Sequence, residues 1–159
     1  MEKLSLLLWR ERELLETLAY KLEVEQLILA SGRTRWLAHS TKEVEQVLET
    51  LRETEVLRAI ASDEVAEELG LTPAPTLAEI AEASPEPWRG ILDDHRMAFI
   101  TATREIADLS ESNRGLITAG YRSARETLLS LGGGNADSYS PTGTAVVDTP
   151  RRRLLDRSL

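Results

Sequence analysis

Apolar residues recur at steps of three and four along three long segments, and this period constrains the fold more than any other feature. Such steps return to one face of an α-helix, so they predict amphipathic helices packed against one another. In the first segment the period is carried by Leu4, Leu7, Leu8, Leu14, Leu15, Leu18, Leu22 and Ile28. Ser31-Gly32 interrupts it, and glycine suits the left-handed position that ends a helix. The first predicted helix therefore covers residues 2–30.

The second segment predicts a helix over residues 33–60. Its stripe consists of Trp36, Leu37, Val44, Val47, Leu48, Leu51 and Leu57. Two helices of similar length that are joined at a tight glycine corner form an antiparallel hairpin.

The third helix has the clearest start signal, the sequence "SPEPW". Ser84 suits the N-cap, Pro85 the first helical position and Glu86 the first turn. A stripe with steps of mostly four and three follows, at Trp88, Leu92, His95, Phe99, Ala102, Ile106, Leu109, Asn113, Ile117, Ala124, Leu128 and Leu131. The glycines at 132–134 end it. This spacing is typical of helices in a coiled-coil-like bundle.

Residues 61–84 connect the second helix to the third. We expect two short helices here, 63–69 and 76–83, which are capped by Asp63 and Thr76 and separated by two prolines. Their apolar residues would cover the base of the bundle, namely Val65, Leu69, Leu71, Leu77 and Ile80.

The stretch "SDEVAEELGLT" at 62–72 resembles the first half of a DNA-binding helix-turn-helix. Such a motif needs cationic side chains to face the groove. Residues 59–88 contain no Lys or Arg, and the whole chain carries 27 acidic against 19 basic residues, a net charge of −8. An acidic surface repels phosphates, so partners made of nucleic acid or anionic lipid are disfavoured. The apolar run Leu4–Trp9 is too short to insert across a membrane.

The sequence contains no pattern that predicts catalysis, a cofactor site or a metal site. Cysteine is absent, and the two histidines, His39 and His95, are far apart in the chain. A metal site in a helical bundle needs more ligands than these. His95 lies on the stripe of the third helix and is expected at the edge of the core. The carboxylates fall on outer helix faces, where they serve solvation.

The helix lengths predict an uncovered surface. At about 1.5 Å per residue the first two helices are each roughly 40–45 Å long, and the third is roughly 70 Å long. The end of the third helix would extend past the hairpin and expose Leu116, Ile117, Tyr121, Ala124, Leu128 and Leu131. A partner protein would cover this surface; the alternatives are a homodimer and a bend at Gly115 or Gly120.

The fold class predicted from these features is all-α. An antiparallel hairpin and a third long helix form a three-helix bundle over residues 1–131, with the two connector helices at its base. Residues 132–159 are rich in Ser, Thr, Pro and Gly and are expected to form a disordered tail. Its segment "TPRRRLLDRSL" is either a solubilising end or a basic segment that folds on an acidic partner.

The chain resembles the flagellar export chaperones of the FlgN family. The resemblance covers nearly the whole chain and is carried by "LLLWRERELLETLAYKLEVEQLIL", "RWLAHSTKEVEQVLETLRETEVLRA", "TLAEIAEASPEPWRGIL", "IADLSESNRGLITAGYRSARETLLSL" and "YSPTG". In the fourth of these, Asn113 and Leu116-Ile117 match the family's Asn-x-x-Leu-Leu-type segment.

The resemblance implies a cytoplasmic chaperone that binds the helical termini of hook–filament junction proteins. Such a chaperone prevents premature assembly and delivers its client to the type III export gate. In that family, the C-terminal part of the long helix is the part associated with partners. The resemblance therefore implies partner-binding roles for Asn113, Leu116, Ile117, Tyr121, Ala124, Leu128 and Leu131. Tyr121 is the candidate aromatic anchor. The alternative is a self-associating coiled-coil adaptor without a role in export.

Overall fold

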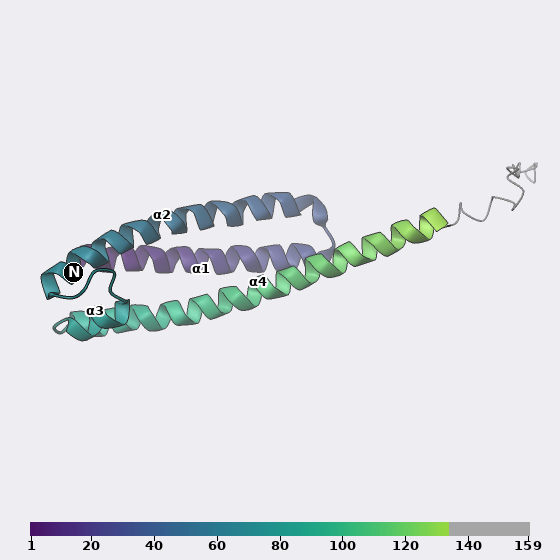
Figure 1. The fold of residues 1–159 in the computed structure, drawn as a ribbon. Coiled ribbons are helices and arrows are strands. Elements are labelled where there is room, and N and C mark those ends of the chain that lie inside the picture. The colour runs from purple at the N-terminus through teal and green to yellow at the C-terminus, as the bar shows by residue number, and fades with distance from the viewer. Residues whose placement is uncertain (134–159) are drawn as a thin grey trace, which may run out of the picture. The chain divides into compact units, whose positions relative to one another are not determined.

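The computed structural model describes residues 1–133, and every regular element in this range is helical (Figure 1). The elements are α1 (Glu2–Ser31), a short 3-10 helix (Thr34–Trp36), α2 (Leu37–Leu69), α3 (Leu77–Ala83) and α4 (Trp88–Gly133). The predicted all-α class is confirmed. The segments "YSPTG" and "TPRRRLLDRSL" lie outside the described residues. Residues 1–118 form one compact unit, and the described residues 119–133 belong to a second unit.

α1 and α2 form the predicted antiparallel hairpin (Figure 1). Gly32 ends α1 in the left-handed conformation, with φ at 68°, and its N–H donates to the carbonyl oxygen of Leu29 over 3.2 Å. A residue with a Cβ atom is strained at this φ, which explains glycine at the corner. α2 begins at Leu37 rather than at 33 because the chain first makes the 3-10 turn.

α2 is longer than predicted, and the separate helix at 63–69 does not exist. Ala61 and Val65 are buried and continue the inner face of α2, so the helix runs on to Leu69. Gly70, with φ at 71°, then ends it. Asp63 is therefore not an N-cap; its carboxylate accepts a hydrogen bond from the backbone N–H of Ala74 at 2.8 Å.

α3 is the one short helix of the connector, and its predicted Thr76 cap is confirmed. The Thr76 hydroxyl accepts from the N–H of Glu79 at 3.2 Å, and the Glu79 carboxylate accepts from the N–H of Thr76 at 2.7 Å. This reciprocal pair is a capping box. The hydrogen bonds from Thr76 also lower the pKa of Glu79.

α4 begins later than predicted. Ser84 belongs to the end of α3, where its hydroxyl donates to the carbonyl oxygen of Ile80 at 2.6 Å. The first residue of α4 is Trp88, whose N–H donates to the carbonyl oxygen of Pro85 at 3.0 Å. The residues around Gly115 and Gly120 are helical, so neither glycine ends α4.

Two apolar clusters hold the first unit together. At the base, α3 contributes Ile80 and Ala81 to a cluster with Leu4, Leu8 and Leu92, and the predicted base residues pack in or against it. The second cluster joins all three long helices, with Leu18, Leu22, Val44 and Leu51 buried and Ile106 and Leu109 packed against them. The three-helix packing is therefore present within residues 1–118.

Candidate functional site

The last turns of α4 carry an exposed apolar stripe. Tyr121, Leu128 and Leu131 are 73%, 70% and 72% exposed, and Ala124 is exposed as well. The positions 121, 124, 128 and 131 recur at steps of three and four, which places them on one helix face. We call these four residues the α4 stripe. Ile117 is half exposed and Leu116 partly buried, and Leu129 adds further exposed apolar surface.

Contact with a partner would stabilise the α4 stripe. Fully burying a leucine side chain is worth about 1.5–3 kcal/mol, so covering Leu128 and Leu131 alone would contribute about 2–4 kcal/mol at their exposure. Contiguous exposed apolar surface of this kind marks interaction sites. The stripe is an apolar helix face that is exposed to solvent in this structure.

Asn113 has a different environment from the stripe, because its side chain is buried between α4 and α1. It is 3% exposed, and its amide nitrogen donates to the carbonyl oxygen of Leu22 at 2.9 Å and to the carboxylate of Glu25 at 3.2 Å. Asn113 follows Leu109 by four positions and therefore lies on the face of α4 that packs against α1.

Glu25 joins this contact to α2. Its second carboxylate oxygen accepts a hydrogen bond from the Thr41 hydroxyl at 2.9 Å. Glu25 is buried, so its charge is satisfied by donors from two other helices. We call Glu25, Thr41 and Asn113 the polar node.

A second buried charge, Glu11, pairs with Arg58 of α2 at 2.8 Å. Burial raises the pKa of Glu11, and the Arg58 guanidinium opposes this effect. The sequence carried a signal for both buried glutamates that the prediction missed. They occupy core positions in an unbroken alternation of steps of four and three: Leu4, Leu8, Glu11, Leu15, Leu18, Leu22, Glu25.

His95 is buried rather than at the core edge. Its ring meets the Trp9 ring edge-on, with centroids 4.9 Å apart. Within residues 1–133 neither ring nitrogen has a hydrogen-bond partner. Burial lowers the pKa of His95, the nearby Arg12 lowers it further, and Asp94 acts in the opposite direction. These effects together favour the neutral ring, which forms part of the core.

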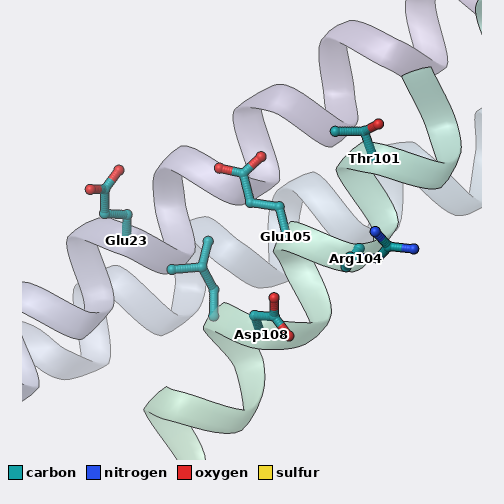
Figure 2. A pocket seen from close by; sticks show the side chains of 6 residues that line it. Glu23, Thr101, Arg104, Glu105 and Asp108 are labelled. Atoms are coloured by element: carbon teal, nitrogen blue, oxygen red, sulfur yellow. The ribbon is translucent and has the colours of Figure 1, made fainter. Parts of the chain in front are cut away.

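The depression between α1 and α4, of about 460 Å³, offers no catalytic arrangement (Figure 2). Glu23 comes from α1, and the other lining residues, Thr101, Arg104, Glu105, Asp108 and Leu109, come from α4. The charged side chains are exposed to water, which weakens electrostatic effects on a bound group. Nowhere in the described residues do three or more His, Asp or Glu side chains gather as a metal site would require.

Comparison with known proteins identifies the family. The family model described as "FlgN protein" matches residues 1–146, which include every described helix. Curated proteins and solved structures give no significant match. No helix among residues 1–133 combines the length and apolar character needed to cross a membrane. With a family match over more than nine-tenths of its length, the chain belongs to the FlgN family of flagellar export chaperones.

Proposed function

We propose that this protein is a cytoplasmic chaperone for hook–filament junction proteins. The observation that supports this most directly is the α4 stripe, which presents Tyr121, Leu128 and Leu131 to solvent in a chain of the FlgN family. Amphipathic helices bind such a surface with apolar residues at helical spacing. The proposed ligand is a helical terminus of the client.

The mechanism is physical rather than chemical. The client helix packs its apolar face on the α4 stripe, so the same face is withheld from assembly with other junction proteins. Tyr121 is the proposed aromatic anchor, because a tyrosine buries a large area at a small entropy cost. Transfer to the type III export gate requires the client to dissociate, which a contact of a few side chains permits.

The test is a binding measurement with purified junction proteins. Leu128→Glu together with Leu131→Glu places two charges in the stripe, and we expect at least a hundredfold weaker binding of the client. Both side chains are exposed, so the circular dichroism spectrum should not change. A matched control is Tyr20→Glu with Leu27→Glu, because these α1 side chains are also mostly exposed. Normal client binding by the stripe variant would refute the proposal.

Sedimentation distinguishes the self-associating adaptor from the chaperone. The adaptor predicts a dimer at low micromolar concentration that the stripe variant dissociates and that no client affects. The chaperone predicts a stoichiometric complex with a junction protein.

A further inference from the structure

The outer side of the hairpin carries a second apolar surface, far in sequence from the α4 stripe. It is a groove of about 540 Å³ between α1 and α2, lined by Glu2, Lys3, Leu6, Leu7, Leu57 and Ile60. Leu6, Leu57 and Ile60 are each half or more exposed, and the neighbouring Val56 is exposed as well. We call this surface the hairpin groove.

The packing of the bundle covers only about half of the Leu57 and Ile60 side chains. α2 contacts its neighbours through the face on which Leu51, Thr54, Ala61 and Val65 are buried. Leu57 and Ile60 lie at the edge of that face, and about half of each side chain remains exposed. Leucine and isoleucine grouped at an exposed position indicate a contact with another molecule.

The charges beside the groove indicate what that molecule carries. On α2, the exposed charged residues three or four positions from Leu57 or Ile60 are Glu53, Asp63 and Glu64. Arg58, next to Leu57, is half-buried and pairs with Glu11. On α1, the corresponding exposed residues are Glu2, Lys3 and Arg10. Lys3 already pairs with Glu64 at 2.7 Å. Four carboxylates thus stand against two cations, and the groove has an apolar floor with an acidic rim.

We propose that the hairpin groove binds a basic amphipathic helix of a partner protein. Leucine-like side chains of that helix would fill the groove, and its Lys or Arg residues would lie against Glu2 and Glu53. A second copy of this chain fits less well, because a symmetric contact would bring the acidic rims together. The groove residues belong to the first unit and the α4 stripe to the second, so the chaperone would have two surfaces for protein partners.

A pair of synthetic peptides tests the chemistry of the groove on the full chain. One is an amphipathic helix of leucine and lysine, and the other has the same leucines with glutamate in place of lysine. We expect the lysine peptide to bind at least tenfold more tightly by fluorescence anisotropy. Leu57→Gln with Ile60→Gln should weaken its binding at least tenfold, while the control Tyr20→Gln with Leu27→Gln should leave it unchanged.

Three results would overturn the proposal. The first is equal binding of the lysine peptide to the groove variant and the control, which would mean non-specific attraction to an acidic protein. The second is a wild-type dimer that the groove variant dissociates, which would assign the groove to a second copy. The third is tighter peptide binding when Arg151, Arg152 and Arg153 are changed to Glu, which would make the chain's own basic segment the occupant.

The client complex separates this inference from the proposed function. The groove variant should bind a junction protein normally, whereas the variant of Leu128 and Leu131 should bind the lysine peptide normally. The groove variant could instead lose binding of both the junction protein and the lysine peptide, with an unchanged circular dichroism spectrum. That result would show one continuous binding site. It would contradict the inference of a second site but not the proposed chaperone function.

Discussion

Replacing Asn113 by alanine tests the polar node. The substitution removes two hydrogen bonds, one to the Leu22 carbonyl and one to the Glu25 carboxylate. A neutral hydrogen bond is worth about 1 kcal/mol, and one to a charged group about 1.5–3 kcal/mol. Glu25 would also keep its buried charge with Thr41 as its remaining side-chain donor. We therefore expect a loss of about 2–4 kcal/mol in the free energy of unfolding.

Urea denaturation followed by circular dichroism measures this loss. With a denaturant slope of about 2 kcal/mol/M, the midpoint should fall by about 1–2 M. The neighbouring Ser112→Ala is the matched control. Like Asn113, Ser112 forms a hydrogen bond to α1, since its hydroxyl accepts from Gln26, but this contact is exposed. Exposed contacts contribute little, so its midpoint should fall by less than about 0.3 M.

The double-mutant cycle with Glu25→Gln measures how much the charge of Glu25 strengthens its contact with Asn113. We expect a coupling energy of about 1–2 kcal/mol, since the free-energy changes of substitutions within one hydrogen-bond network do not add. If Asn113→Ala costs no more than Ser112→Ala, the polar node contributes nothing and the reasoning fails. If Asn113→Ala leaves the free energy of unfolding unchanged but weakens client binding, Asn113 belongs to the partner surface.

Two further predictions concern pH and the helix corner. Burial lowers the pKa of His95 in the folded state below its ordinary value of 6.5. At acidic pH the unfolded chain therefore binds a proton at His95 more readily than the folded chain does. The free energy of unfolding should fall as the pH drops below about 6.5. His95→Leu should flatten this dependence in urea titrations at pH 7.5 and 5.5; an unaltered slope would contradict it. Gly32→Ala should lower the free energy of unfolding by about 1 kcal/mol because of the positive φ, while Gly115→Ala, in a helix with open space around it, should raise stability slightly in thermal melts.

Local signals in the sequence predicted several elements well. The Gly32 corner and the Thr76 cap were both predicted, because a left-handed glycine and an N-cap involve residues only a few positions apart. Local signals also produced the errors. Ser84 and Asp63 are good N-cap residues, yet one ends α3 and the other ties a loop to α2. A cap residue suits more than one position, and the buried face of Ala61 and Val65 decided that α2 continues.

For the candidate site, too, some features could be predicted from the sequence and others depended on contacts between helices. The common face of the α4 stripe follows from helical spacing, and its exposure could be predicted from the greater length of the third helix. The inward position of Asn113 and the burial of Glu25 depend on donors from other helices, Thr41 among them. No local pattern reports whether a polar residue at a core position will find such a partner.

The sequence by itself determined that this chain is helical, acidic and able to pack through leucine-rich faces, because period and composition act along the chain. The tertiary structure decided which of those faces is buried within the bundle. The inner faces of α1 and α2 cover each other, whereas Leu57 and Ile60 remain exposed beside carboxylates. An apolar residue has the same spacing whether it is covered or not, so only the packing of the helices distinguishes core from contact surface.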